Sequence, residues 1–578
     1  MCLKKLILLL ISLCISYTYI YSQTPYSFPG FPKNFDHQRM PTIKSGVPVV
    51  ADLDNDGNKE IIAVGGDYEN VSTIPYMLHV IKTDGNEMNG FPKPYFQYIE
   101  DIAAGDINGD GYIDIAVRQT DTIDVIDRNG IHLPGFPIIY KTLDPSYWQD
   151  LNFINLYDLD NDGSLEIITC QYGALAVFDN HGHFKPGWPK PIVGRVLSNP
   201  AIGDLDNDGK AEIVCTQLKK LYALPYIDSP SINILRYDGS AFSNNWPIYH
   251  DSLFHAFLAS PSIYIGASAG DSYIITTIQK GTISNPYISI KYLKYNIYAQ
   301  LLDSIRFDNE AANNDQTMAM GDVNGDGILE YSMSLNPDLY LFSSDFKILP
   351  GWPQYGSGST FRSTSVAKLT NGSELKIIIP GSTANDSGGF VYAYDKSGVP
   401  LNWSPLRSAG ANNGLCLTDL NNDGSVEIVT TNAKWDTSLF ISIWTVPGIA
   451  FNHNDFPWPE YCHDRYKSNQ YGFIPPDEPN GIQPMSNKVP KEFSLYQNYP
   501  NPFNPSTAIK YTVKSSALIN LSVYDVLGRK ISEIVNENQR PGTYSVSFDG
   551  FNLSSGVYYY RLTADGAVID TRKMILIK

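Results

Sequence analysis

The sequence predicts an all-β protein: a β-propeller, which is a ring of repeated four-stranded sheets, followed by a small C-terminal immunoglobulin-like β-sandwich. Three observations predict this fold. A nine-residue acidic loop recurs six times, and each copy runs into a β-branched segment. An aromatic residue followed by proline precedes most of these loops. Short alternating apolar segments fill the last 85 or so residues. Repeats of this length that read as several short strands are typical of propeller blades.

The N-terminal segment, residues 1–22, has the layout of a secretory signal peptide. Lys4 and Lys5 precede an apolar run from Leu6 to Ile15, and small or polar residues follow up to Ser22. We expect cleavage after Ser22. A lipoprotein anchor at Cys14 is disfavoured because Leu13 stands where a small residue is needed. No other run approaches the roughly 20 apolar residues of a membrane helix, so we predict no transmembrane segment.

The acidic loop has the pattern Asp-x-Asp/Asn-x-Asp-Gly-x-x-Asp/Glu. Alternating oxygen donors at positions 1, 3 and 5, a main-chain carbonyl at 7 and a carboxylate at 9 are the ligands that calcium prefers. The residues at these five positions are, loop by loop, Asp52, Asp54, Asp56, Asn58 and Glu60; Asp106, Asn108, Asp110, Tyr112 and Asp114; Asp158, Asp160, Asp162, Ser164 and Glu166; Asp204, Asp206, Asp208, Lys210 and Glu212; Asp322, Asn324, Asp326, Ile328 and Glu330; Asp419, Asn421, Asp423, Ser425 and Glu427.

Two further positions support calcium over an acidic turn that binds nothing. Position 6 is glycine in all six copies, as a sharp turn with positive φ requires, and position 2 is always apolar, as expected of a core anchor. An EF-hand starts the same way but needs a bidentate Glu at position 12, where the first copy has Ala63. An isolated copy would not decide the matter. Six copies predict about six calcium ions.

The spacing of the loops predicts eight blades, with seven as the alternative. Asp204 and Asp322 are two repeats apart, so one repeat between them has lost its loop, most plausibly in the stretch from Ser262 to Thr277. A second degenerate copy has Lys368 at position 1. Its ammonium either takes the place of calcium or is a plain surface lysine. The aromatic-proline marker recurs from Phe31-Pro32 to Trp458-Pro459.

These loops and their spacing resemble the FG-GAP repeats of integrin α-chains, also called VCBS-like repeats, which occur in many secreted bacterial propellers. The resemblance covers the predicted propeller, residues 23–475. It implies a calcium-binding propeller but no particular function, since such propellers include adhesins, sugar-binding proteins and some enzymes.

Charge and cysteine content agree with this prediction. The net charge of −18 is largely local, because the ligand positions of the six loops alone hold 21 carboxylates. No cluster of basic residues indicates nucleic-acid binding. Cys170, Cys215, Cys416 and Cys462 are too sparse for a disulfide scaffold, and we expect buried free thiols.

A stretch rich in proline, residues 476–491, predicts a linker, and residues 492–578 predict the small sandwich. This segment resembles the type A C-terminal sorting domain of the type IX secretion system of Bacteroidota-like Gram-negative bacteria. The matching motifs are the opening from Tyr499 to Pro505, Tyr524 to Arg529, Pro541 to Tyr544, Ser555 to Tyr559 and Lys573 to Lys578. The resemblance implies the secretion machinery as a partner. It also implies an extracellular or outer-surface location, with release or attachment to lipopolysaccharide. A sugar-binding sandwich is the alternative.

The sequence leaves two functions open. The first is an adhesion or binding module for an extracellular glycan or protein. The second is a secreted polysaccharide-degrading enzyme of the lyase type, which needs a Lys, Tyr or His base facing a cleft. We find no recognisable catalytic motif: the GxSxG match around Ser268 continues into a predicted strand rather than the helix of a nucleophile elbow. We therefore predict no catalytic residues and favour the binding module.

Overall fold

The computed structural model describes residues 25–36, 46–65, 75–140, 153–171, 174–191, 195–196, 198–221, 227–250, 260–280, 289–308, 317–335, 338–355, 364–382, 388–408, 411–434, 438–460, 462–476, 484–486, 493–498, 501–503, 506–514, 517–539, 542–549, 553–564 and 566–577. The predicted signal peptide, residues 1–22, lies outside them. The chain divides into two compact units, one made chiefly of residues up to Pro479 and the other chiefly of Asn480–Lys578.

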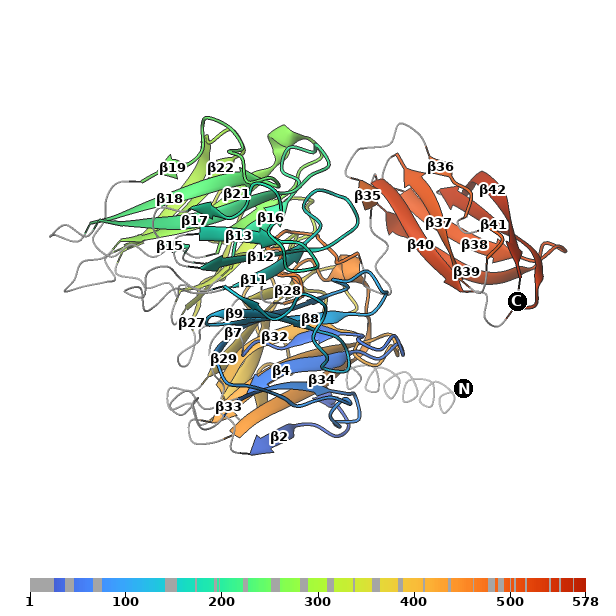
Figure 1. The fold of residues 1–578 in the computed structure, drawn as a ribbon, viewed down its shortest axis with the longest axis horizontal. Coiled ribbons are helices and arrows are strands. Elements are labelled where there is room, and N and C mark those ends of the chain that lie inside the picture. The colour runs from blue at the N-terminus through green and yellow to red at the C-terminus, as the bar shows by residue number, and fades with distance from the viewer. Residues whose placement is uncertain are drawn as a thin grey trace, which may run out of the picture. The chain divides into compact units, whose positions relative to one another are not determined.

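Within the described residues, the first unit contains eight antiparallel sheets that follow one another along the chain, which confirms eight blades (Figure 1). Blade 1 contains β3 (Val49–Ala51), β4 (Glu60–Gly65), β5 (Tyr76–Ile81) and β6 (Lys93–Tyr95); blade 2, β7 (Ile99–Gly105), β8 (Asp114–Gln119), β9 (Thr122–Ile126) and β10 (Ile138–Ile139); blade 3, β11 (Ile154–Tyr157), β12 (Glu166–Gln171), β13 (Ala174–Phe178) and β14 (Lys190–Pro191); blade 4, β15 (Arg195–Val196), β16 (Ala201–Gly203), β17 (Glu212–Leu221), β18 (Ile227–Arg236) and β19 (Ile248–Tyr249).

The remaining blades follow the same plan. Blade 5 contains β20 (Ser262–Tyr264), β21 (Tyr273–Lys280), β22 (Ser289–Asn296) and β23 (Leu301–Asp308); blade 6, β24 (Ala319–Gly321), β25 (Glu330–Leu335), β26 (Asp338–Phe342) and β27 (Gln354–Tyr355); blade 7, β28 (Ser365–Ala367), β29 (Lys376–Ser382), β30 (Gly389–Tyr394) and β31 (Leu406–Ser408); blade 8, β32 (Ala411–Thr418), β33 (Ser425–Lys434), β34 (Ser438–Ala450), β1 (Tyr26–Ser27) and β2 (Lys33–Asp36).

Blade 8 joins the two ends of the propeller. β1 and β2 from the N-terminal side pair antiparallel with β34, so that Tyr26 lies opposite Thr445 and Lys33 opposite Ile441. Inner strands of neighbouring blades contact each other, as in the pairs β3–β7, β7–β11, β16–β20, β24–β28 and β3–β32. The ring is therefore closed, and these strands line its centre. Closure protects the strand edges of the first and last blades.

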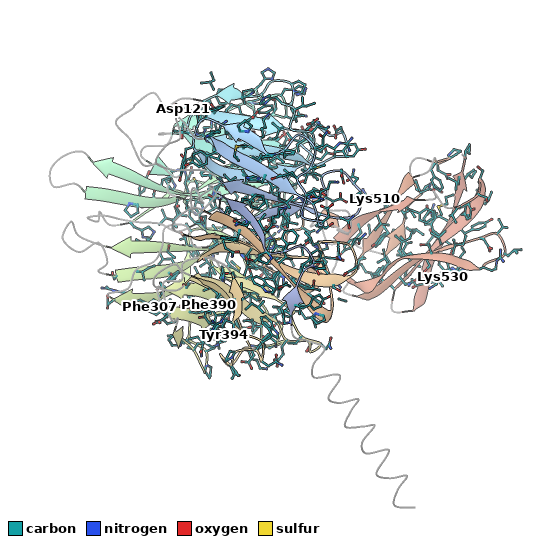
Figure 2. All side chains as sticks on the ribbon, turned by 90° about the horizontal axis from the view of Figure 1, so that it is seen from below. Asp121, Phe307, Phe390, Tyr394, Lys510 and Lys530 are labelled. Carbon is teal, nitrogen blue, oxygen red and sulfur yellow. The ribbon has the colours of Figure 1, made fainter. Side chains whose placement is uncertain are left out.

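The aromatic-proline markers connect neighbouring blades. The indole nitrogens of Trp188, Trp246 and Trp352 donate hydrogen bonds, 2.8–2.9 Å long, to backbone carbonyls of the following blade. Trp352 also packs edge-on against Tyr394 of β30, labelled in Figure 2, with ring centroids 5.8 Å apart. The preceding glycine is needed for close approach: a Cβ at Gly90 would lie 2.0 Å from the carbonyl oxygen of Asn129. The marker is thus a fastener between blades.

Trp458 does not belong to this series, which corrects the sequence-based assignment. The marker of blade 8 is Phe31-Pro32 on the N-terminal strand pair, because the ring closes there. In blade 7 the position is held by Trp403, with a serine inserted before Pro405. Trp458 is fully buried and bridges to Val366 of β28.

Residues 455–460 and 462–471, which we call the central segment, lie against the inner strands of the ring. Backbone N–H groups of six first strands donate hydrogen bonds of 2.8–3.2 Å to its carbonyls: Val366 to Trp458, Leu417 to Pro459, Ala104 to Arg465, Leu156 to Tyr466, Ile202 to Ser468 and Ile263 to Asn469. The channel-facing edges of these strands would otherwise need water. The segment therefore satisfies the inner backbone of blades 2, 3, 4, 5, 7 and 8.

The central segment is polar yet buried. Lys467 is 2 % exposed, and its ammonium lies 3.5 Å from the carboxylate of Asp101 on β7, which is fully buried. Burial alone would lower the pKa of Lys467, but the neighbouring Asp101 raises it above its ordinary value. Backbone N–H groups of Ile102 and Ile154 also donate to Asp101. The segment is thus held by a buried ion pair with its own hydrogen bonds.

The second unit is a β-sandwich, as predicted. One sheet has the order β35-β40-β37-β36 and the other β39-β38-β41-β42. The strands are β35 (Pro484–Ser486), β36 (Ser494–Leu495), β37 (Ser506–Val513), β38 (Ala517–Tyr524), β39 (Lys530–Gln539), β40 (Gly542–Asp549), β41 (Gly556–Ala564) and β42 (Ala567–Leu576). β35 lies inside the stretch predicted as linker, residues 476–491. Its pairing with β40 makes it a strand of the sandwich. Tyr560, at the core, donates to the Tyr496 carbonyl, 2.8 Å away.

Three smaller predictions also find their outcome in the structure. Cys170, Cys215, Cys416 and Cys462 are buried free thiols, as predicted. The GxSxG match, residues 266–270, ends within a short 3-10 turn, η1 (Ala269–Asp271), and strand β21 rather than a helix follows, so the segment is not a nucleophile elbow. A second 3-10 turn, η2 (His453–Asp455), precedes the central segment. No helix in the described residues is long and apolar enough to cross a membrane.

Candidate metal centres

The six acidic loops occupy equivalent turns, each between two neighbouring strands of a blade: β3–β4, β7–β8, β11–β12, β16–β17, β24–β25 and β32–β33. They belong to blades 1, 2, 3, 4, 6 and 8. The apolar residue at position 2 is at most 1 % exposed in every loop, so it anchors the loop to the core as predicted. These residues are Leu53, Ile107, Leu159, Leu205, Val323 and Leu420.

Position 9 is a buried carboxylate with one oxygen committed to the loop backbone. Its side chain accepts a hydrogen bond from the N–H of position 2 in all six loops, at 2.8–3.1 Å. The six residues, each 2 % exposed or less, are Glu60, Asp114, Glu166, Glu212, Glu330 and Glu427. The same contact in six blades means that one loop conformation is repeated around the ring.

Position 1 closes the turn over the glycine. In five loops the carboxylate at position 1 accepts the N–H of the glycine at position 6, at 2.8–2.9 Å. The six glycines have φ between 83° and 92°, where only glycine is free of steric cost. Position 4 also has positive φ and is always Asn or Gly, for example Asn55 and Gly109. We missed that position, although its restricted composition was visible in the sequence.

Position 7 contacts its loop through the backbone N–H, and the Asn58 side chain also donates to Asp56. The calcium contact of the position 7 carbonyl oxygen stays a prediction. The N–H of position 7 donates to the carboxylate at position 5 in five loops, at 2.7–2.9 Å. The side chains at this position contact other groups: the Tyr112 ring lies 3.5 Å from the guanidinium of Arg128, and the Lys210 ammonium lies 3.9 Å from the ring of Tyr237. Ile328 is exposed.

Several carboxylate oxygens face the loop interior. In the loops that begin at Asp52, Asp158 and Asp204, oxygens of positions 1, 3 and 9 lie within 4.8 Å of one another, close enough for one metal ion. The Oδ1 atoms of Asp54, Asp160 and Asp206 are buried and have no hydrogen-bond partner among the described residues. The same holds for Oε1 of Glu427 in the loop that begins at Asp419. Buried carboxylate oxygens without a partner are costly unless a cation binds them.

Burial raises the pKa of every carboxyl at position 9. The pKa of Glu60 is raised to about 8 and that of Glu212 to about 9, in each case mainly by desolvation. Desolvation also raises the pKa values of Asp114, Glu166, Glu330 and Glu427 to about 7. Neighbouring loop carboxylates add to the effect. A bound divalent cation would favour the charged forms instead.

These pKa shifts predict an unusual pH dependence of stability. The metal-free folded protein holds protons more tightly than the unfolded chain, so it is most stabilised below the unfolded pKa of about 4.5. That stabilisation is lost as the pH rises through the folded pKa values of about 7 to 9. We expect the melting temperature in EGTA to fall between pH 5 and pH 8, and to fall less with calcium. Thermal scans in both buffers check this, and a metal-free midpoint that rises over this range would contradict it.

The two degenerate repeats have lost the ligand geometry. In blade 5, β20 and β21 form the same hairpin as in the other blades, but the stretch between them contains η1 and lacks the acidic ligand pattern, as predicted for Ser262 to Thr277. In blade 7, the Lys368 ammonium pairs with the carboxylate of Asp455 at 2.9 Å. Lys368 is therefore not a plain surface lysine, because it links blade 7 to Asp455 at the start of the central segment.

Three basic side chains reach into acidic loops from the end of the third strand of their blade or from the turn that follows it. Lys82, Lys185 and Arg236 contact the carboxylates of Asp54, Asp160 and Asp206 at 2.8–3.0 Å. We did not predict them. The available signal was composition: these are the three loops with aspartate rather than asparagine at position 3.

Comparisons with known families match both units of the fold. Residues 158–215, which contain two of the acidic loops, match the FG-GAP-like repeat. Residues 497–578 match the secretion system C-terminal sorting domain. The class of protein defined by the fold and these matches is an exported propeller with an FG-GAP-like repeat. More particularly, it carries a type IX sorting domain, which implies export to the cell surface or beyond in Bacteroidota-like bacteria.

No curated protein matches the chain. Similar solved structures include the biofilm matrix protein Bap1 of V. cholerae, with 13 % identity, a TM-score of 0.36 and coverage of 76 % of this chain and 94 % of that one. The WD40 domain of Toxoplasma gondii coronin has 11 % identity, a TM-score of 0.31 and coverage of 78 % and 95 %. The Neurospora crassa Pan2 WD40 domain has 11 % identity, a TM-score of 0.36 and coverage of 75 % of this chain and 98 % of that one. At these values the similarities carry no argument about ligands.

Proposed function

We propose that the protein is a calcium-stabilised propeller, exported by the type IX secretion system, that binds an extracellular glycan or protein. About six calcium ions sit in the acidic loops, one in each. After export the protein is released or attached to surface lipopolysaccharide. The support for calcium is the repeated set of oxygen ligands and the buried carboxylate oxygens that lack a protein partner.

One observation carries the binding role: apolar side chains are exposed on the rigid face that bears the acidic loops. Because neighbouring strands are antiparallel, the acidic loops and the turns between the third and fourth strands lie at the same end of each blade. Ile131, Phe184, Ile348 and Val399 stand on these turns in blades 2, 3, 6 and 7 and are 41–63 % exposed. Turns held by a rigid scaffold are the usual place for recognition. Calcium would stiffen this face before a ligand arrives.

Binding assays with and without product detection test this proposal. The calcium-loaded protein should be retained on at least one member of a panel of polysaccharides and bacterial or host surface proteins, without forming new unsaturated sugar ends. The double variant Ile131→Ser, Val399→Ser should lose affinity at least several-fold with an unchanged melting temperature, because both side chains are exposed. Formation of unsaturated products, or full affinity of the variant, would contradict binding at this face.

The alternative is a polysaccharide lyase. Among the described residues, the nearest approach to a lysine or tyrosine base is Lys294, whose ammonium donates to the Tyr331 hydroxyl at 2.9 Å. Tyr331 in turn donates to Tyr273 at 3.0 Å. Burial lowers the pKa of Lys294, as a base requires. However, Tyr331 is fully buried and Lys294 lies against both tyrosine rings, so the cluster favours packing between blades 5 and 6.

A further inference from the structure

The three basic residues in the acidic loops follow a rule of charge. Loops with aspartate at position 3 hold four carboxylates at positions 1, 3, 5 and 9, and each also receives Lys82, Lys185 or Arg236. Loops with asparagine at position 3 hold three carboxylates. Four negative charges with one positive charge equal three negative charges. With all its carboxyls ionised, the ligand set of every loop, together with its basic residue where present, therefore carries a net charge of −3.

The contact is the same in all three aspartate loops. The basic group binds the Oδ2 atom of position 3: Lys82 to Asp54 at 2.8 Å, Lys185 to Asp160 at 2.9 Å and Arg236 to Asp206 at 3.0 Å. The Oδ1 atom of each of these aspartates is the buried oxygen without a partner among the described residues. One oxygen is thus neutralised by the protein, and the other is left for a metal ion.

The asparagine loops place a neutral amide at position 3 instead, and its Oδ1 atom accepts the N–H of position 5 in all three loops. The Nδ2 group of Asn108 donates to Asp110 at 3.0 Å, and that of Asn421 donates to Asp423 at 2.9 Å. Asn324 donates to Glu330 at 2.9 Å. An amide offers one oxygen acceptor and one nitrogen donor without charge. An aspartate whose Oδ2 atom binds an ammonium or guanidinium forms a neutral pair that likewise presents an oxygen acceptor and a nitrogen donor.

The basic residues come from different positions at or after the end of the third strand. Lys82 directly follows β5, and Arg236 is the last residue of β18. Lys185 lies later in its turn, where its N–H bonds to the carbonyl of Val177. Despite this difference, each side chain ends on Oδ2 of position 3. Two routes to one contact indicate that the contact itself matters, rather than an inherited turn sequence.

We propose that Lys82, Lys185 and Arg236 are built-in counter-ions that position the aspartate at position 3 and set the charge of three calcium sites. They hold the carboxylate cluster together before calcium is bound. They also keep the charge seen by calcium equal to that of the asparagine loops. In the metal-free protein they reduce the repulsion among four carboxylates, and in the calcium form they remain on Oδ2. The calcium part of this inference rests on the proposed function.

Blade 3 offers the sharpest test. The Lys185 ammonium is 18 % exposed and contacts Asp160 at 2.9 Å and Glu166 at 2.8 Å. The experiment compares the full-length wild type with Lys185→Met, Asp160→Asn and the double variant by thermal unfolding in EGTA and in saturating calcium. Lys347→Met is the matched control, because Lys347 lies on the equivalent turn of blade 6, is 80 % exposed and pairs only locally with Asp345.

In EGTA, Lys185→Met should lower the melting temperature by roughly 1–3 °C, an amount that a large domain shows for a modest loss of stability. Adding Asp160→Asn should restore it, because the loop then carries −3 with an amide at position 3. In calcium, Lys185→Met should melt close to the wild type, so its calcium-induced shift is larger. Asp160→Asn alone leaves a charge of −2 and should show a smaller calcium-induced shift. Lys347→Met should match the wild type throughout.

Two results would overturn the inference. Lys185→Met could lower the melting temperature equally in both buffers, as a loss of packing would, or Asp160→Asn could fail to restore the midpoint in EGTA. Failure of the proposed function would look different: calcium would not raise the wild-type midpoint at all. The EGTA comparison decides the counter-ion role in either case.

Discussion

We expect chelation of calcium to lower the melting temperature of the propeller by about 16 °C. A site at a free calcium concentration of one hundred times its Kd contributes about 2.7 kcal/mol, so six independent sites contribute roughly 16 kcal/mol. A domain of roughly 450 residues has an unfolding entropy of about 1 kcal/mol/K, at about 2.1 cal/mol/K per residue. The ratio of these two quantities gives the expected shift. Circular dichroism or differential scanning calorimetry in calcium and in EGTA measures it.

The control for this prediction is the identity of the ion. Calcium added after EGTA should restore the midpoint, and magnesium at the same concentration should restore little of it. Magnesium demands octahedral geometry at shorter distances, whereas calcium accepts the irregular oxygen set of such loops. A midpoint that is the same in calcium and in EGTA would show that the loops have no structural need for the ion.

Substitution of Lys467 by methionine is expected to destabilise the propeller by about 3–5 kcal/mol, the usual result of leaving one partner of a buried ion pair alone. The charge left behind is that of Asp101, which is fully buried on β7 and 3.5 Å from the ammonium. The remaining donors to it, Ile102, Ile154 and Asn199, bind through neutral N–H groups. Urea unfolding followed by tryptophan fluorescence measures the loss, since Trp458 within the central segment is fully buried.

A double variant distinguishes the effect of an unpaired charge from the effect of altered side-chain packing in the central segment. Asp101→Asn combined with Lys467→Met removes both charges and should recover part of the lost stability. Lys347→Met again serves as the exposed control and should unfold with the wild type. If Lys467→Met is as stable as the wild type, the central segment does not hold the ring through this ion pair.

Local chemistry made much of this fold predictable. The sequence of each acidic loop predicts its conformation, because the turn needs glycine at position 6, an apolar residue at position 2 and a carboxylate at position 9. The eight-blade count followed from loop spacing, since even the degenerate repeat at Ser262 keeps the strand pattern of its neighbours. The signals were short in range and repeated, and repetition made them readable.

The missed features depend on contacts between distant parts of the chain. The central segment has no strand or helix periodicity, and Lys467 is buried only because Asp101, far away in sequence, accepts its charge. Trp458 has the aromatic-proline signature but serves another purpose, because ring closure gives the last marker to Phe31. β35 is too short for its sequence to predict a strand inside a proline-rich stretch. Only its pairing with β40 identifies it as a strand.

The central claim is that the six loops hold calcium, and the metal content of the purified protein tests it most directly. The secreted protein, dialysed against buffer with low free calcium and then analysed by plasma mass spectrometry against amino-acid analysis, should contain about six calcium ions per chain. Simultaneous loss of ions and of thermal stability on EGTA treatment should follow. A calcium content of half that number or less, in protein that remains folded, would contradict the account.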